Sequence, residues 1–151
     1  MLPSYISAYF DILGKAQKVY SKYLEPVSRK WELTRSELDV MLFLHNNPGY
    51  SRATDIVSHR GMTKSHVSMS VSSLVERGLL LRQFSPDDRR TVHLILTEQG
   101  HLIAEEARIL QQQFFEVIYT DVSREEMAVL RKVTLKVCEN IDNIDKVLAN
   151  P

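Results

Sequence analysis

The side chains with the clearest chemistry in this chain are basic and small polar groups gathered between residues 63 and 100. Lys64 stands near the start of a predicted helix, and Arg89 and Arg90 end a short charged turn that begins at Asp87. Guanidinium and ammonium groups bind phosphate oxygens, while hydroxyl and imidazole groups can hydrogen-bond to the edges of bases. These residues therefore favour recognition of a nucleic acid.

No arrangement typical of catalysis or of metal binding is found in the sequence. No candidate nucleophile has a partner base, and no glycine-rich loop is suited to a nucleotide phosphate. The five histidines are scattered, and His101 is followed one helical turn later by Glu105 and not by a second histidine. Cys138 falls within the last predicted helix, where we expect a buried, inert thiol. We therefore expect no enzyme, no metal and no cofactor.

The elements that must position the basic and polar groups are two helices and a hairpin. A short helix is predicted over residues 53–57, and Gly61 allows a tight reversal before the next one. That second helix is predicted over residues 63–77, and Gly78 breaks it. Two extended runs follow, joined by a charged tip over residues 85–90. This order is the layout of a winged helix-turn-helix, which places its second helix in the major groove of DNA.

The second helix is predicted to present a polar face to DNA. Its inward-facing apolar residues are Val67, Val71, Leu74 and Val75. Free N–H groups and the helix dipole at the start of this helix favour phosphate. The residues predicted to contact the DNA backbone there are Thr63, Lys64 and Ser65. The residues placed for base edges are His66, Met69 and Ser73, flanked by Ser68 and Ser72. The alternative interpretation is that the serines form only a solvated surface.

The hairpin tip is the second predicted DNA contact. Pro86 stiffens the tip, and Asp88 is expected to pair with Arg90 and hold its guanidinium in one orientation. A pre-oriented arginine fits the narrow minor groove of A·T-rich DNA, where the potential is most negative. Arg89 is expected to meet phosphate, and Arg82 in the first strand completes the set. The alternative is a charged turn of the kind found on any surface.

The passage also resembles the MarR family of bacterial transcription regulators. The matching residues are Val67-Ser68, Leu74-Val75-Glu76-Arg77, Gly78-Leu79, Arg82, Pro86, Asp88-Arg89-Arg90 and Leu96-Thr97-Glu98-Gln99-Gly100. The Asp-x-Arg wing and the Leu-Thr-x-x-Gly after it are the family's best-known signature. The resemblance implies a homodimeric regulator, usually a repressor, that binds a pseudo-palindromic site on double-stranded DNA. Many relatives carry arginine at the position of Met69, so its absence implies weaker reading of guanine there.

Helices at both ends of the chain are predicted to form the dimer interface. Apolar residues recur at helical spacing from Tyr5 to Leu24, and Pro26 is expected to end or kink that helix. Ser123 opens a capping box for a last helix with a heptad seam, and the simplest partner for that seam is a second copy. The expected interface residues are Tyr5, Tyr9, Leu13, Met127, Leu130, Val137, Ile141, Ile144 and Leu148.

A small-molecule site is implied by the resemblance alone. Relatives often bind small amphipathic or phenolic compounds between the dimer arm and the DNA lobe, which changes the spacing of the two recognition helices. The aromatic residues that could line such a cleft are Tyr20, Tyr23, Trp31, Phe43, Phe114 and Tyr119. The alternative is that most of them are core residues.

The expected architecture is mainly α with a small β wing, a winged helix-turn-helix flanked by N- and C-terminal dimerisation helices. Residues 1–32 are assigned to the N-terminal dimerisation helix, residues 33–97 to the DNA-binding lobe and residues 98–151 to the C-terminal dimerisation helices. The lobe begins at a capping box, in which the Thr34 hydroxyl and the Glu37 carboxylate each satisfy a backbone N–H group of the other residue.

Composition agrees with a regulator of this kind. The net charge of the 151 residues is zero, but residues 52–97 hold seven Lys or Arg against four acids. A modestly basic lobe suits a protein that turns one face to phosphates. No signal peptide or membrane span is visible, so we expect a cytoplasmic protein without a membrane partner. The second hypothesis is a winged-helix interaction module that has lost DNA binding, and Lys64, Arg82, Asp88 and Arg90 argue against it.

Overall fold

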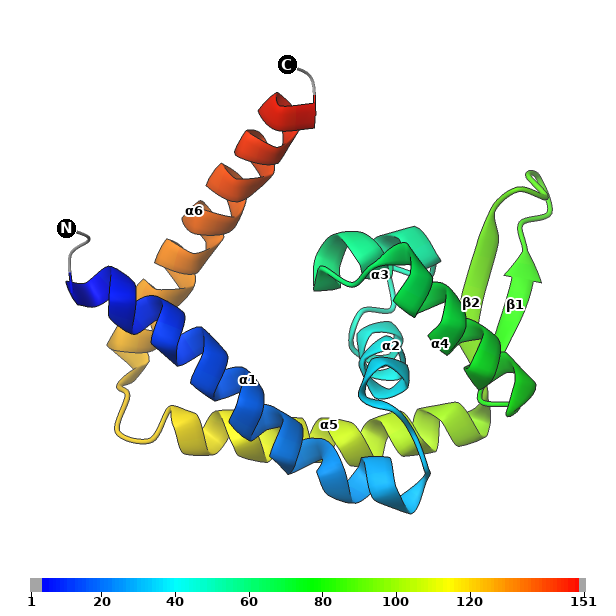
Figure 1. Cartoon of the computed structure of the whole chain (residues 1–151), viewed down its shortest axis with the longest axis horizontal. Helices are drawn as coiled ribbons and strands as arrows, with labels where there is room; N and C mark the ends of the chain where they lie inside the picture. The colour runs from blue at the N-terminus through cyan, green and yellow to red at the C-terminus, as the bar shows by residue number, and fades with distance from the viewer. Residues whose placement is uncertain (1–3, 150–151) are drawn as a thin grey trace. The chain divides into compact units, whose positions relative to one another are not determined.

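The computed structural model describes residues 4–149, with side chains described from residue 7 onward. The elements, in chain order, are α1 (Ser4–Lys30), α2 (Arg35–Asn46), α3 (Ala53–Arg60), α4 (Lys64–Glu76), β1 (Leu80–Phe84), β2 (Val92–Leu96), α5 (Glu98–Ile118) and α6 (Arg124–Ala149) (Figure 1). The chain divides into two compact units, Met1–Phe115 and Glu116–Pro151. This arrangement confirms the predicted mainly helical fold with a small β wing.

Helix α2 is a core helix of the first unit. The Thr34 hydroxyl accepts a hydrogen bond from the Glu37 backbone N at 3.2 Å, and the Glu37 carboxylate accepts one from the Thr34 backbone N at 2.7 Å. The predicted capping box is therefore confirmed. From Leu38 to Leu44 every residue except Asp39 is buried, as expected for a helix that is surrounded by other elements.

Helix α1 continues through Pro26 to Lys30, so of the two expected outcomes, an end or a kink at this proline, the first is wrong. Proline removes one backbone donor, and this loss is normally unfavourable inside a helix. Here Pro26 itself is exposed, while Leu24 and Val27 on either side of it are buried in the core. Packing of these two residues holds the helical backbone in place across the proline.

Helix α5 packs closely on the chain segment that leads into β1. The Thr97 hydroxyl accepts a hydrogen bond from the Gly100 backbone N at 3.1 Å and donates one to the Gly78 carbonyl at 2.9 Å. A Cβ atom at Gly100 would lie 2.2 Å from the Leu79 carbonyl oxygen. The glycine of the Leu-Thr-x-x-Gly sequence is therefore required by close packing of helix against backbone.

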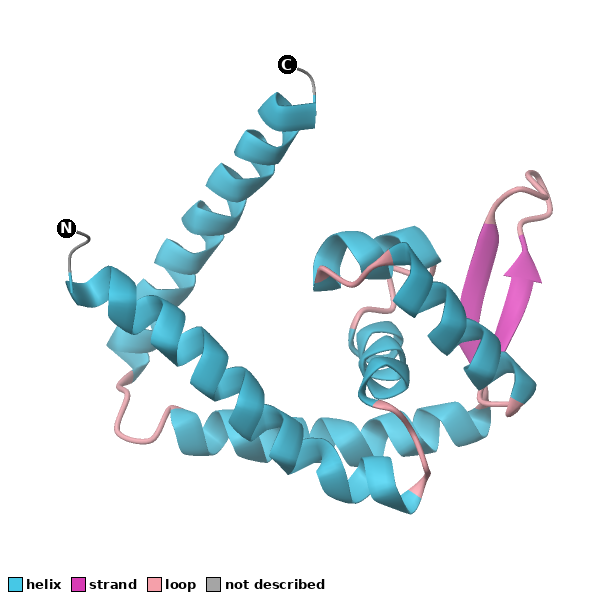
Figure 2. Ribbon diagram, in the orientation of Figure 1, coloured by secondary structure: helices cyan, strands magenta, loops and turns pink. Residues whose placement is uncertain are grey.

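The strands β1 and β2 form a two-stranded antiparallel hairpin, shown in magenta in Figure 2. Its register pairs Leu80 with Leu96 and Phe84 with Val92. The buried residues Leu80, Leu94 and Leu96 share one face, as the two-residue alternation of a strand requires. The other end of the hairpin carries the charged tip. The wing therefore combines an apolar base with a polar end.

The second unit consists mainly of α6. The Ser123 hydroxyl accepts a hydrogen bond from the Glu126 backbone N at 3.1 Å, and the Glu126 carboxylate accepts one from the Ser123 backbone N at 2.8 Å. This confirms the second predicted capping box. No residue of α6 is buried within this single chain. In the described part of the chain, no helix has the length and apolar character needed to cross a membrane.

Candidate nucleic-acid interface

Helix α4 is held at its start by the residues that the sequence predicted. Gly61 adopts a left-handed conformation with φ of 61°, which L side chains rarely adopt, and it ends α3. The Thr63 hydroxyl then accepts a hydrogen bond from the His66 backbone N at 3.1 Å. Gly61 and Thr63 together fix the angle between α3 and α4. This angle sets which side chains of α4 point away from the protein.

The outward face of α4 agrees largely with the prediction. Val67, Val71 and Leu74 are buried, and so is Ser70, whose small side chain lets α4 approach the core. The predicted contacts that are exposed are Thr63, Lys64, Ser65, His66, Ser68, Met69 and Ser72. Met69 is 69% exposed, which leaves its apolar side chain free to meet a partner. The helix therefore offers one cation and several short polar groups around a single methionine.

Ser73 is the exception among the predicted base-reading residues. It is half-buried, and its hydroxyl donates a hydrogen bond to the buried carboxylate of Glu37 on α2. Burial alone would raise the pKa of Glu37. Hydrogen bonds from Ser73 and Thr34, together with the nearby Arg77, outweigh burial and lower this pKa. The prediction that Ser73 faces outward is thus wrong, because helical spacing cannot show that a serine has a buried carboxylate as its partner.

Arg77 is a residue that the sequence analysis did not assign to any role in the site. Its guanidinium donates to the backbone carbonyls of Glu32 at 3.0 Å and Trp31 at 2.5 Å, and it lies 3.9 Å from the Glu37 carboxylate. These contacts join the end of α4 to the end of α1. No local pattern predicts them, because the partners are carbonyl groups about 45 residues away in the sequence.

The wing is joined to the helix-turn-helix by contacts at two points. The Arg82 guanidinium on β1 donates a hydrogen bond to the Ser72 hydroxyl on α4 at 3.0 Å. On β2, the Leu94 backbone N donates to the Ser51 carbonyl at 2.7 Å, and the Ser51 hydroxyl lies 2.7 Å from His93 Nδ1. These contacts attach both strands of the wing to the helix-turn-helix.

The wing tip is organised differently from the prediction. One oxygen of the Asp88 carboxylate accepts a hydrogen bond from the Arg90 backbone N at 2.9 Å, and the other accepts one from the Thr91 hydroxyl at 3.0 Å. No ion pair joins Asp88 to the Arg90 side chain among the described residues. The expected pairing is wrong, because the aspartate is already used to close the tip, as Asx side chains commonly do in turns. Arg89 and Arg90 are both exposed.

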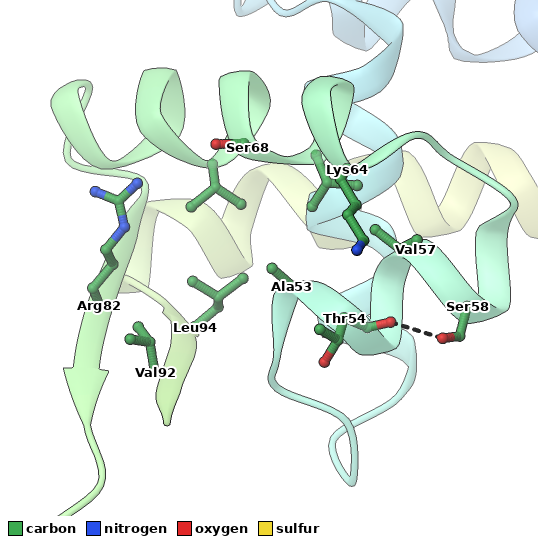
Figure 3. Close-up of a pocket in the computed structure, with 11 residues that line it drawn as sticks. Ala53, Thr54, Val57, Ser58, Lys64, Ser68, Arg82, Val92 and Leu94 are labelled. Carbon is green, nitrogen blue, oxygen red and sulfur yellow. Dashed lines mark hydrogen bonds between the residues drawn. The ribbon is translucent and has the colours of Figure 1, made fainter. Parts of the chain in front are cut away.

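An apolar cavity of about 460 Å³ lies between α3, α4 and the wing. Val57, Val92 and Leu94 form part of its wall, and Lys64, Ser68 and Arg82 bring polar groups to it (Figure 3). A second cleft, of about 290 Å³, brings together Arg52, the start of α3 and Arg90 of the tip. Arg52 was not among the residues predicted for the site. Its position directly before a helix was the only signal, and that signal does not reveal its proximity to the wing.

Comparison with known proteins agrees with this geometry. The model of the MarR family matches residues 31–91, which include α2, α3, α4 and β1. The DNA-binding part of the chain is thus similar to the MarR family. Over 145 residues the chain is 24% identical to the uncharacterized HTH-type transcriptional regulator YdgJ of Bacillus subtilis (strain 168). This match covers 96% of this chain and 88% of that protein.

Two solved structures show that the resemblance extends to the fold of most of the chain. One is a MarR family transcriptional regulator from Listeria monocytogenes complexed with a 26mer DNA, with a TM-score of 0.78, 18% identity and coverage of 89% of each chain. The other is NadR in complex with 4-hydroxyphenylacetate, with a TM-score of 0.70 and 21% identity. That match covers 83% of this chain and 88% of NadR.

The aromatic residues predicted to line an effector cleft do not all gather in one place. The ring of Phe114 lies 5.1 Å from Tyr20 and 5.5 Å from Tyr23, measured between centroids. Phe43 instead stacks on His59, with centroids 5.9 Å apart, and the Trp31 indole N–H donates to Glu106 at 3.1 Å. The sixth predicted residue, Tyr119, belongs to the second unit.

Tyr20, one of the predicted effector residues, lines a cavity of about 250 Å³. Its hydroxyl accepts a hydrogen bond from the Gln111 side chain at 2.7 Å, and burial raises its pKa. Arg35 and Asp39 face the same cavity and form an ion pair at 2.8 Å. Burial raises the pKa of Asp39, although Arg35 opposes the effect. The cavity thus combines an aromatic wall with a charged pair.

The residues predicted for the dimer interface are mostly exposed in the single chain. Tyr9 is 54% exposed and Leu13 is 50% exposed on α1, while the Tyr5 side chain lies outside the described residues. On α6, Met127 is half-buried, and the exposed seam residues are Leu130, Val137, Ile141, Ile144 and Leu148. Cys138 is exposed as well, contrary to the prediction of a buried thiol. No residue of α6 is buried in the described chain, so burial of this thiol would need a further surface.

His101 takes part in a contact between α2 and α5. Its Nδ1 lies 3.1 Å from His45 Nδ1, and His45 Nε2 lies 2.9 Å from the Glu105 carboxylate. Hydrogen bonds from Arg108 and His45 lower the pKa of Glu105 to about 2. Over residues 4–149, no group of three or more His, Cys, Asp and Glu side chains is arranged to hold a metal ion. The cluster is therefore best described as a polar contact between helices.

Proposed function

We propose that this protein is a transcription regulator that binds specific sites on double-stranded DNA as a homodimer and represses transcription. The observation that carries the proposal is the joining of α4 to the wing through Arg82 and Ser72, 3.0 Å apart. This hydrogen bond holds the wing, which has exposed arginines at its tip, beside the exposed face of the recognition helix. A surface of this kind can contact the major groove and the adjacent minor groove together.

The charge and shape of the surface support binding of DNA. Lys64 at the start of α4 is placed to meet phosphate, where helix N–H groups and the dipole add to its charge. His66, Ser68 and Met69 follow on the exposed face for base edges and thymine methyl groups. Arg90 extends beyond this helix at the wing tip. Because Ser73 is held by Glu37, the proposed reading face is narrower than the sequence analysis predicted.

The proposal of a homodimer rests on the exposed apolar side chains of α1 and α6. A helix that places Ile141, Ile144 and Leu148 in water, at 58%, 58% and 72% exposure, is unfavourable without a partner. A symmetric dimer would present two recognition helices about 34 Å apart, one turn of B-DNA, and would favour a pseudo-palindromic site. Repression would follow where such a site overlaps a promoter.

We also propose that a small phenolic or amphipathic compound modulates binding from the Tyr20 cavity. NadR, which has the same fold, was solved with 4-hydroxyphenylacetate, a phenolic carboxylate. In this chain, Arg35 and Arg60 line the cavity with Tyr20 and could neutralise an acidic ligand. The cavity lies among α1, α2 and α5, which connect the proposed dimer arm to the DNA lobe.

The proposal is tested by selecting bound fragments from the organism's own genomic DNA, including the region upstream of its coding sequence. The recovered duplex and a scrambled duplex of the same composition are then compared by fluorescence anisotropy over a salt series. We expect selective binding with a steep salt dependence. Equal binding to both duplexes, or none, would contradict the proposal and favour an interaction module.

A further inference from the structure

An exposed aromatic ring lies on the same face of the wing as Arg82, one of the proposed DNA contacts. Phe84 ends β1, is 59% exposed and pairs in register with Val92 of β2. Directly opposed residues of an antiparallel pair share one face of the sheet, and residues two apart on a strand do so as well. Val92 and Arg82 line the cavity beside α4 (Figure 3). The side chain of Phe84 is therefore on the face that is turned toward the recognition helix.

The ring lies between two arginine positions on this face. Arg82 precedes it by two residues, a distance of roughly 7 Å along a strand. Arg90 lies in the tip, two residues before Val92 of β2, and it lines a cleft that Val92 also lines. The hairpin ladder continues past Phe84, because the Ser85 backbone N donates to the Thr91 carbonyl at 2.9 Å. Arg90 is thereby held next to the end of β1.

Charge distinguishes this face of the wing from the opposite one. The opposite face carries Leu81 and Ile95, which are cross-strand partners and are 54% and 40% exposed. The other strand residues on that face are Gln83 and His93, so its strand positions carry no arginine or lysine. An apolar ring with an arginine position on either side matches the edge of a minor groove, where apolar sugar lies next to charged phosphate. The Leu81 face lacks this complementarity.

We propose that Phe84 is an additional DNA contact, whose ring packs on the deoxyribose between the phosphate bound by Arg82 and the minor groove entered by Arg90. This inference rests on the proposed function. The contact is apolar, so it adds affinity without releasing counterions. It fixes the depth of the wing in the minor groove, which in turn positions Arg90.

The test compares Phe84→Ala, Phe84→Leu and Leu81→Ala in the full-length protein, by anisotropy on the duplex recovered by genomic selection. We expect Phe84→Ala to weaken binding about tenfold while the slope of log K against log salt stays unchanged. Phe84→Leu should keep most of the affinity because it keeps an apolar contact. Leu81→Ala, matched in exposure on the opposite face, should change affinity by less than about twofold.

Wild-type affinity for Phe84→Ala, or an equal loss for Leu81→Ala, would overturn the inference while leaving the proposed function intact. Failure of the wild-type protein to select a duplex would instead overturn the proposed function. If Phe84→Ala does not fold, a photo-crosslinking phenylalanine at position 84 replaces it, with the same group at position 81 as control. Crosslinking to the duplex from position 84 alone supports the contact, and crosslinking from both or neither overturns it.

Discussion

At the scale of single residues, Arg90 is the most direct test of the wing. Its guanidinium is exposed, and only its backbone N–H is fixed by Asp88. We expect Arg90→Ala to weaken specific DNA binding by about 1–3 kcal/mol and to reduce the salt slope by about one, with the dimer intact. Anisotropy over a salt series measures both. Lys132→Ala, which removes an exposed cation from α6, serves as control, and an unchanged affinity in folded Arg90→Ala would remove the wing tip from the mechanism.

Ser73 is expected to stabilise the fold and not to read bases. Removing its hydroxyl leaves the buried Glu37 carboxylate without one of its donors. Ser73→Ala should therefore lower the free energy of unfolding by about 1–3 kcal/mol and leave the preferred DNA sequence unchanged. Urea unfolding and binding selection measure these two effects. Ser68→Ala, on the exposed face of the same helix, is the control for stability, and a changed base preference in Ser73→Ala would restore Ser73 as a reading residue.

The same carboxylate gives an expected dependence of stability on pH. The pKa of Glu37 lies below its ordinary value of 4.5 in the folded chain, so ionisation of this group favours folding. Its contribution is complete above the unfolded pKa and is lost as pH falls from there through the lower folded pKa. Glu37→Gln should be less stable than wild type at pH 7, and the difference should shrink as pH falls below 4.5. A constant difference from pH 7 to pH 3 in urea titrations would contradict this assignment.

The role of a polar side chain was predictable from the sequence only where its hydrogen-bond partner lies within a few residues along the chain. Thr34, Thr63 and Ser123 cap their helices as predicted, because an N-cap needs a backbone N–H only two or three residues away. Ser73 was predicted wrongly because its partner is on another helix. Asp88 was predicted wrongly for a different reason, since several local donors compete for the same carboxylate. Periodicity does not determine which of them is satisfied.

At the scale of elements, the approach of α5 to the wing depends on Gly100. A Cβ atom there would meet a backbone carbonyl at 2.2 Å, and backbone cannot move aside as a flexible side chain can. We expect Gly100→Ala to destabilise the fold by about 1–3 kcal/mol despite the better helix propensity of alanine. Urea unfolding at a fixed protein concentration measures the change.

The control for this substitution is Gly14→Ala on α1, where an added Cβ meets nothing within 4 Å. Alanine there should stabilise the chain by up to about 1 kcal/mol. If both substitutions behave alike, close packing is not the reason for glycine at position 100. The glycine itself was visible in the sequence motif, but its physical reason became clear only from the position of the Leu79 carbonyl.

At the scale of the whole molecule, the seam of α6 is expected to hold two copies together. A charge placed in this seam would be buried without a partner in the dimer. Ile141→Asp should therefore shift the protein toward monomer and weaken binding to a two-fold site. The adjacent Asn140→Asp adds the same charge beside the seam and should leave the dimer unchanged. Sedimentation equilibrium measures both, and a dimeric Ile141→Asp protein would exclude α6 from the interface.

Heptad spacing predicted α6 and its apolar stripe from the sequence, but not what covers the stripe. The same limit explains Cys138, which was expected to be buried because it falls in a helix, and which is exposed in a single chain. Spacing within one chain carries no information about a surface supplied by a second one.

The most direct test of a dimer that reads DNA with α4 and the wing is a hydroxyl-radical footprint on the recovered duplex. We expect two equivalent protected patches related by a two-fold axis, with centres about 10 base pairs apart. Each patch should include a minor-groove segment at its outer edge, where the wing tip lies. A single asymmetric patch, or protection without a minor-groove component, would contradict the account.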